Sequence, residues 1–126
     1  MKTAKPTRAA GFTLVEIMIV VAIIGLLAAI AIPSFVHART VSQANACINN
    51  LRQIESAVQQ VAINNGLHIG DTVNYPADVT AYIKLNSNQK IPGCPAMGNY
   101  SLSTVGSIPQ ALCSLGNTVT PPHVLP

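Results

Sequence analysis

A long apolar segment, residues 12–36, limits what this chain can fold into more than any other feature. The segment reads FTLVEIMIVVAIIGLLAAIAIPSFV, and its only polar residues are Thr13, Glu16 and Ser34. As an α-helix rising about 1.5 Å per residue it would be roughly 37 Å long, whereas the hydrocarbon core of a bilayer is about 30 Å thick. The segment is therefore predicted to be a transmembrane helix.

The charges predict the orientation of this helix. The chain has seven Lys and Arg residues and four Asp and Glu residues, which gives a formal net charge of +3. Three basic residues, Lys2, Lys5 and Arg8, lie within residues 1–11. Because basic flanks stay on the cytoplasmic side, the N-terminus is predicted to be cytoplasmic and everything after Val36 to lie across the membrane. Those three residues account for the whole net charge, so the remaining chain is formally neutral and nucleic acid is not an expected partner.

Glu16 is the anomaly within the apolar segment. A carboxylate near the end of a membrane helix costs up to a few kcal/mol unless it is paired, protonated or close to the interface. No Lys or Arg lies within residues 12–36. A positive partner would have to come from elsewhere, and a free α-amino group is a suitable candidate. The alternative is a glutamate at the level of the cytoplasmic head groups.

The stretch GFTLVE, residues 11–16, follows a short basic leader and precedes the apolar helix. In this it resembles the N-terminal signature of type IV prepilins and type II secretion pseudopilins. The resemblance implies that a prepilin peptidase cuts between Gly11 and Phe12 and then N-methylates Phe12. It also implies that Glu16 takes part in subunit assembly, where it would meet the new ammonium group of a neighbouring copy. Such a pair in a low-dielectric core loses several kcal/mol when one partner is removed.

Two other interpretations of the N-terminus stay open. An ordinary secretory signal peptide, cut after Ala29-Ile30-Ala31, would leave a protein that begins at Ile32. Its apolar region would be longer than the usual length of about 7–15 residues, and Glu16 would be unexplained. An uncleaved single-span anchor would still begin at Met1.

The helix is predicted to continue beyond the membrane. From residue 37 to residue 64 apolar residues recur every three or four positions among polar ones, which indicates an amphipathic helix. Pro33 lies within the apolar run and Gly25 two turns before it, and both weaken a helix. Pilin-like proteins place a glycine and a proline similarly. The resemblance implies that the helix between Gly25 and Pro33 loosens in a filament.

Residues 65–126 are rich in Pro and Gly and predict a small C-terminal head. Within it, residues 76–84 are predicted to form a short helix, residues 100–105 alternate as a strand does, and residues 112–115 are the candidate partner strand. The predicted fold class is α+β: a long N-terminal helix, half in the membrane and half amphipathic, packed by a small antiparallel sheet as in pilins.

Three cysteines, Cys47, Cys94 and Cys113, bear on the stability of the head. Outside the cytoplasm disulfides form readily. A disulfide between Cys94 and Cys113 would close a loop of about 20 residues and stabilise the head by roughly 3 kcal/mol, so it is the favoured pairing. A pairing of Cys47 with either of the others stays open. A zinc site is not expected, because the three cysteines and three dispersed histidines lack the short paired spacing of zinc ligands.

No catalytic motif is present, and an enzyme is not expected. The histidines at 37, 68 and 123 lie in different contexts without a nucleophile motif nearby. Calcium, which major pseudopilins often bind in an Asp-rich C-terminal loop, is not expected either, because Asp78 is the last acidic residue. No cofactor is therefore predicted.

The resemblance implies a structural subunit of a type IV pilus-like or type II secretion pseudopilus filament. Its partners would be further copies of itself, the prepilin peptidase and an inner-membrane assembly platform. It would lie first in the bacterial inner membrane, with the head in the periplasm, and then in the filament. Two alternatives stay open: a minor pilin whose head binds a substrate or DNA at the tip, and a membrane-anchored protein without a filament role.

Overall fold

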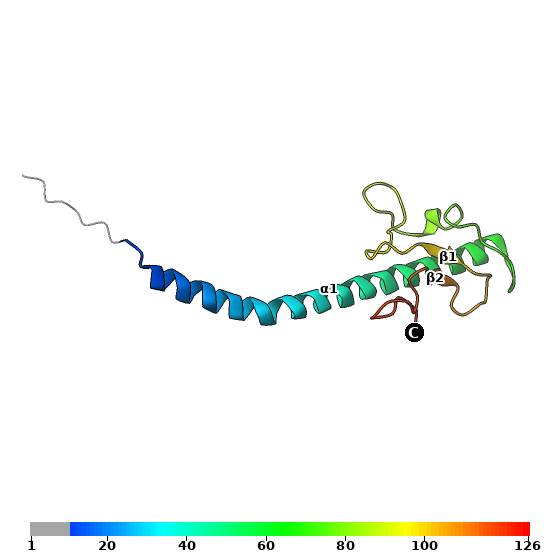
Figure 1. Cartoon of the computed structure of the whole chain (residues 1–126). Coiled ribbons are helices and arrows are strands. Elements are labelled where there is room, and N and C mark those ends of the chain that lie inside the picture. The colour runs from blue at the N-terminus through cyan, green and yellow to red at the C-terminus, as the bar shows by residue number, and fades with distance from the viewer. Residues whose placement is uncertain (1–10) are drawn as a thin grey trace, which may run out of the picture. The chain divides into compact units, whose positions relative to one another are not determined.

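The computed structural model describes residues 11–126, so the predicted basic leader lies outside the described residues except for Gly11. The chain divides into two compact units, Met1–Val36 and His37–Pro126. One helix, α1 (Leu14–Asn65), contributes residues to both units (Figure 1). The remaining elements belong to the second unit and are the 3₁₀ turn η1 (Thr80–Tyr82) and the strands β1 (Tyr100–Leu102) and β2 (Ala111–Cys113). The predicted α+β class, a long helix with a small antiparallel sheet, is confirmed.

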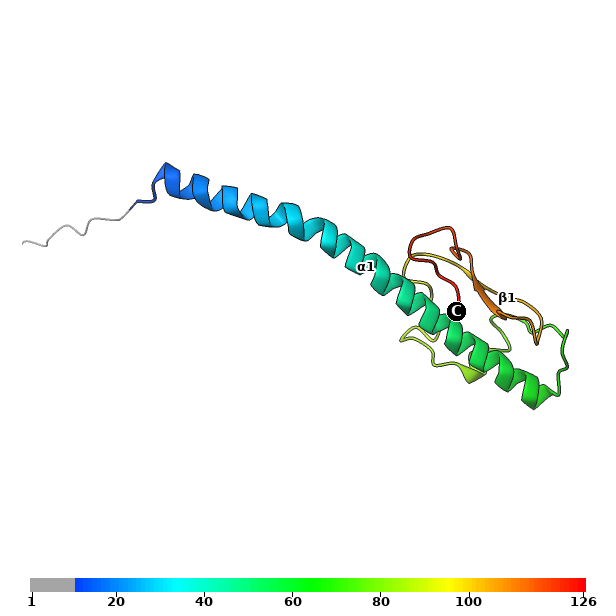
Figure 2. The ribbon, with the colours of Figure 1, turned by 90° about the horizontal axis from the view of Figure 1, so that it is seen from below.

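In the second unit α1 supplies one side of the hydrophobic core. Its buried side chains are spaced three or four residues apart, so they lie along one face of the helix. They are Ala44, Cys47, Leu51, Ile54, Ala57, Val58 and Val61. Figures 1 and 2 show the C-terminal segments lying against this half of α1. The helix ends at Asn65, and Gly66 follows with a φ of 64°, a left-handed conformation that glycine adopts without strain.

The sheet has two short antiparallel strands. Tyr100 pairs with Cys113 and Leu102 with Ala111. Along β2 the side chains alternate, with Ala111 and Cys113 buried in the core and Leu112 exposed. The strand predicted over residues 100–105 stops at Leu102, because the backbone N–H and C=O of Val105 bond instead to residues 70 and 71.

The region predicted to be a short helix, residues 76–84, forms only turns and η1. Two local bonds account for this. The Thr80 hydroxyl donates to the carbonyl oxygen of Pro76 at 2.6 Å, and the Asp78 carboxylate accepts a hydrogen bond from the Asn74 backbone N–H at 3.0 Å. Polar side chains that bond to nearby backbone groups in this way stabilise turns in competition with a regular helix.

Substitutions at two adjacent residues of α1, one buried and one exposed, are expected to change the stability of the protein by different amounts. Ile54 is fully buried, whereas Gln53 is exposed. Ile54→Ala is expected to lower the free energy of unfolding by about 2–5 kcal/mol, and Gln53→Ala by less than about 0.5 kcal/mol. Urea unfolding of the full chain in detergent, followed by tyrosine fluorescence of the head, measures both. Equal unfolding midpoints for the two variants would show that this face of α1 does not carry the core.

Candidate functional site

The residues on either side of the predicted cut, Gly11 and Phe12, lie shortly before α1. Gly11, Phe12 and Thr13 precede α1 and have no regular secondary structure, and all three are exposed. The Phe12 side chain is 85% exposed. A Cβ added at Gly11 would meet no atom within 4 Å. Among residues 11–126, therefore, no side chain found near Gly11 covers the Gly11–Phe12 peptide bond.

Thr13 and Glu16 form a capping box at the N-terminus of α1. The Thr13 backbone N–H and hydroxyl donate to Glu16 Oε2 at 3.0 and 2.9 Å, and the Glu16 backbone N–H donates to the Thr13 hydroxyl oxygen at 3.2 Å. These bonds satisfy donors that a helix start leaves free. Sequence reasoning missed this contact, although the Thr-x-x-Glu spacing that signals it lies within the GFTLVE stretch.

The capping box leaves one Glu16 oxygen free. Oε2 accepts both hydrogen bonds from Thr13, and among residues 11–126 no donor bonds to Oε1. The carboxylate thus has one oxygen that holds the helix start and a second that is open to a cation. The α-amino nitrogen of Phe12 belongs to the residue directly before the cap, so a chain that begins at Phe12 carries both charges at one end of the helix.

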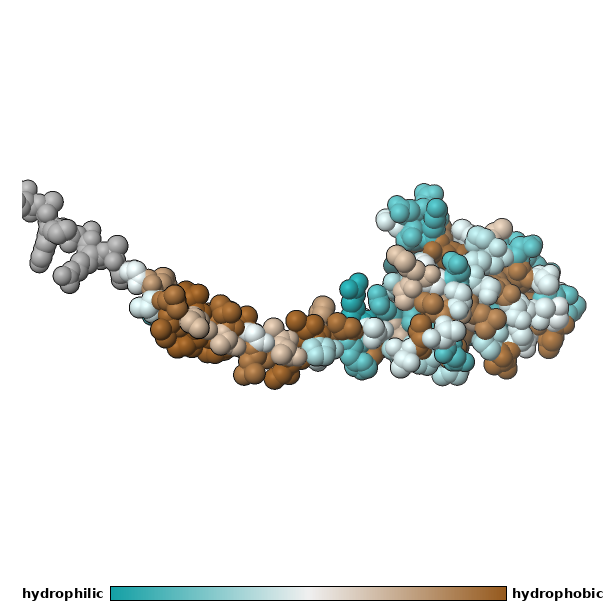
Figure 3. All heavy atoms as spheres, in the orientation of Figure 1, coloured by the Kyte–Doolittle hydropathy of each residue, from teal (hydrophilic) through white to brown (hydrophobic). Residues whose placement is uncertain are grey.

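The large apolar side chains of residues 12–36 are exposed. In Figure 3 brown spheres cover most of the visible face of this helix segment. Its large hydrophobic residues are each more than half exposed; those at the start, middle and end include Leu14, Ile24 and Phe35. Within residues 11–126, α1 is the one helix long and apolar enough to cross a membrane. Such a continuous apolar surface requires lipid or other helices to cover it.

The two residues predicted to loosen the helix both lie inside α1. A Cβ added at Gly25 would meet nothing within 4 Å, so no side-chain packing requires glycine there. Pro33 lacks the N–H that would bond to the carbonyl oxygen of Ala29 one turn earlier. Loosening between Gly25 and Pro33 stays a prediction about the filament.

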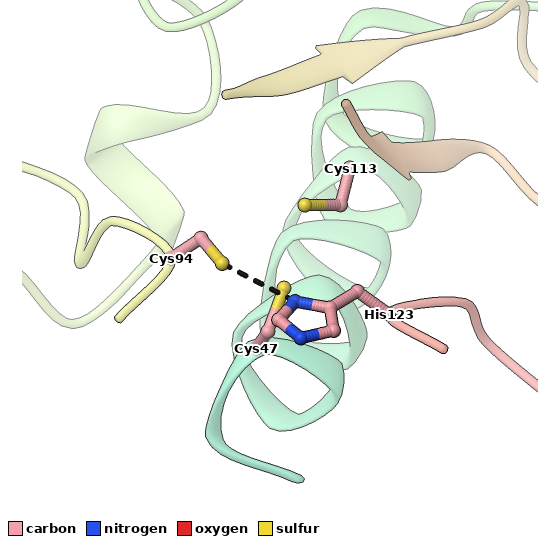
Figure 4. Close-up of side chains that lie close together, drawn as sticks. All are labelled: Cys47, Cys94, Cys113 and His123. Carbon is pink, nitrogen blue, oxygen red and sulfur yellow. Dashed lines mark hydrogen bonds between the residues drawn. The ribbon is translucent and has the colours of Figure 1, made fainter. Parts of the chain in front are cut away.

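The three cysteines and one histidine come together in the second unit. We call Cys47, Cys94, Cys113 and His123 the thiol–imidazole cluster (Figure 4). All four are buried, and their sulfur and nitrogen ligand atoms lie within 4.8 Å of one another. The favoured Cys94–Cys113 disulfide is not formed in the structure, in which all three cysteines are free. Sequence spacing did not reveal the cluster, because its members come from α1, the loop before β1, β2 and the C-terminal segment.

The pKa values of the Cys47 and Cys94 thiols are shifted in opposite directions. Burial raises the pKa of the Cys47 thiol to about 12. Burial also acts to raise the pKa of Cys94, but the backbone N–H groups of Ala96 and Gly98, with the neighbouring thiols, hold that pKa below its usual value. The cluster therefore favours a thiolate at Cys94 in particular.

Comparison with known proteins bears on the N-terminal segment. Residues 6–32 match a family model described as the prokaryotic N-terminal methylation motif. The chain is 53% identical over 47 residues to the type IV major pilin protein PilA of Myxococcus xanthus, covering 37% of this chain and 21% of that protein. It is 42% identical over 57 residues to the fimbrial protein EcpB of Eikenella corrodens, covering 45% and 36%.

A third match covers a larger share of the chain. The chain is 35% identical over 74 residues to the type IV major pilin protein PilE of Neisseria gonorrhoeae, covering 59% of this chain and 44% of that protein. The matched part is less than half the length of each of these three relatives. No solved structure matches the chain.

Proposed function

We propose that this chain, a type IV prepilin-like protein, is a structural subunit of a type IV pilus-like filament. The observation that carries the proposal is an exposed Gly11–Phe12 pair shortly before a helix segment whose large apolar side chains are exposed. The relatives quoted above are pilins and a fimbrial protein, which favours a pilus over a secretion pseudopilus.

Processing is the first step of the proposal. In the inner membrane, with the N-terminus cytoplasmic, a prepilin peptidase hydrolyses the Gly11–Phe12 bond. Water adds across this bond, so Gly11 leaves with a carboxylate and Phe12 gains an ammonium group. N-methylation of Phe12 keeps this positive charge at neutral pH. Removal of residues 1–11 also removes the three basic residues that favour a cytoplasmic N-terminus.

Assembly is the second step. Once an inner-membrane assembly platform brings copies together, the exposed apolar surface of residues 14–36 is covered by the same segment of neighbouring copies instead of by lipid. A repeated rotation and rise that does not close generates a fibre. The free Oε1 of Glu16 accepts a hydrogen bond from the Phe12 ammonium group of a neighbour, and this ion pair sets the axial register of the subunits.

The mass of the intact protein from its native host tests the proposal. Filaments sheared from cells are expected to contain a chain that begins at Phe12 and carries one methyl group. A chain beginning at Met1 would indicate an uncleaved anchor, and one beginning at Ile32 would indicate a secretory signal peptide. Either result, or absence of the chain from the sheared fraction, would contradict the proposal.

A further inference from the structure

We propose that the thiol–imidazole cluster binds one structural zinc ion. Three cysteines and one histidine are a donor set that zinc takes in structural sites, where it is four-coordinate and tetrahedral. The cluster supplies four such ligand atoms, all within 4.8 Å of one another, and supplies them from buried side chains. This inference does not depend on the proposed role in a filament.

One distance in the cluster is close to the separation of ligand atoms around a zinc ion. Zinc–sulfur bonds of about 2.3 Å and zinc–nitrogen bonds of about 2.0 Å place tetrahedral ligand atoms roughly 3.5–3.8 Å apart. Cys94 Sγ and His123 Nδ1 are 3.4 Å apart, which is close to that separation (Figure 4). A disulfide joins two sulfurs at about 2.05 Å and would leave one thiol and the imidazole without a role.

A hydrogen-bonded turn begins at Cys94. The Met97 backbone N–H donates to the Cys94 carbonyl oxygen at 3.0 Å, which closes a turn over residues 94–97. This turn fixes the backbone at Cys94, which supplies one of the four ligand atoms of the cluster.

The lack of a side chain at Gly98 leaves space for the Cys113 sulfur. A Cβ added at this position would lie 2.6 Å from Cys113 Sγ, closer than real contacts allow. The backbone at Gly98 therefore passes so close to Cys113 Sγ that any larger residue at position 98 would displace the sulfur or the loop. Because residue 98 has no side chain, the Cys113 thiol has room to lie beside the other ligand atoms of the cluster.

A second layer of polar groups holds Cys47. The Tyr100 hydroxyl donates to Cys47 Sγ at 3.6 Å, and the Asn50 side-chain amide donates to the Tyr100 oxygen at 3.2 Å and to the Gly93 carbonyl oxygen at 3.1 Å. Groups that orient the ligands of a metal contribute strongly to its affinity. The amide of Asn50 also ties α1 to the residue directly before Cys94.

A zinc ion here would hold together a head with little regular structure. Its two strands are three residues each, and a domain with so small a sheet needs a further stabilising cross-link, such as a disulfide or a metal ion. The ion would join α1, the loop before β1, β2 and the C-terminal segment at one point. On binding, the three thiols lose their protons to solvent and His123 stays neutral, which leaves a complex with one net negative charge.

Metal analysis of the full chain tests the proposal. The protein, purified in detergent and dialysed against a mild chelator, is expected to hold about one zinc per chain. Since second-layer changes alone cost about 10–100-fold in metal affinity, Cys113→Ser and His123→Ala are expected to retain less than about a tenth of that zinc. His68→Ala is the matched control, because the His68 side chain is exposed, and it should retain the full content.

A glycine pair gives a second test that leaves every ligand in place. Gly98→Ala is expected to lower zinc content, whereas Gly25→Ala, whose added Cβ meets nothing within 4 Å and which belongs to the first unit, should not. In the unaltered protein, replacement of zinc by Co²⁺ should produce the visible absorption bands of a tetrahedral, thiolate-coordinated ion, so the assignment does not depend on any variant folding.

Three results would overturn the zinc site. One is a metal-free native protein whose mass is lower by two hydrogen atoms, since that shows a disulfide. Another is full zinc content in both Cys113→Ser and His123→Ala. The third is iron or copper in place of zinc in the protein from its native host.

Discussion

Glu16→Ala is expected to abolish filament assembly while the Gly11–Phe12 bond is still cut. Assembly in the proposal brings the Phe12 ammonium of one copy to the free Oε1 of Glu16 in the next, within a core of apolar helices. Removing one partner of a buried ion pair costs about 3–5 kcal/mol, because the other charge is left unpaired in a low dielectric. At about 1.4 kcal/mol per tenfold, each subunit contact would weaken by roughly 100-fold or more.

The capping box makes a sharper comparison possible. Glu16→Ala removes both the charge and the bonds to Thr13, whereas Glu16→Gln keeps an oxygen that accepts those bonds and removes only the charge. If the ion pair sets the register, both variants lose filaments. If Glu16 only caps the helix, the loss is about 1 kcal/mol in helix stability and Gln restores assembly.

Electron microscopy of sheared fractions, with immunoblots for total and processed chain, measures these outcomes. Thr13→Val completes the set, because it removes the cap hydroxyl and keeps the Glu16 charge. It is expected to assemble at a near-normal level. Normal filament yield from Glu16→Gln would refute the ion pair and leave capping as the role of Glu16.

The sequence predicted the elements that depend on local patterns. Apolar composition marked residues 12–36, and three- and four-residue spacing marked the buried face of α1 from Ala44 to Val61. The position of β1 followed from alternation, but its end did not. Val105 leaves the strand because its backbone bonds to residues 70 and 71, and a partner about 35 residues earlier leaves no local signal.

The two parts of the candidate sites that sequence reasoning missed have different causes. The capping box between Thr13 and Glu16 was readable, but the carboxylate was interpreted only as a charge in a membrane. The thiol–imidazole cluster was not readable, because the ligands are separated by 47, 19 and 10 residues along the chain (94 − 47, 113 − 94 and 123 − 113). Only the packing of the loop before β1, of β2 and of the C-terminal segment on α1 brings them together.

Gly11→Ala is expected to slow cleavage of the precursor without changing its fold. Among residues 11–126 a Cβ at Gly11 meets nothing within 4 Å, so alanine there makes no clash with the described part of the chain. Any effect must then arise where the peptidase holds the residue before the cut. An extra methyl group in a close-fitting site costs about 1–3 kcal/mol, which corresponds to a rate roughly 5- to 150-fold lower.

Gly25→Ala is the matched control for this experiment. Its added Cβ also meets nothing within 4 Å, and it lies well inside α1, away from the cut. Alanine there favours the helix by about 1 kcal/mol, so the membrane segment stays intact. Pulse–chase labelling gives the precursor half-life for both variants. A long-lived precursor with Gly11→Ala and a normal one with Gly25→Ala would locate peptidase recognition at Gly11, whereas equal half-lives would mean that the cut lies elsewhere in the chain.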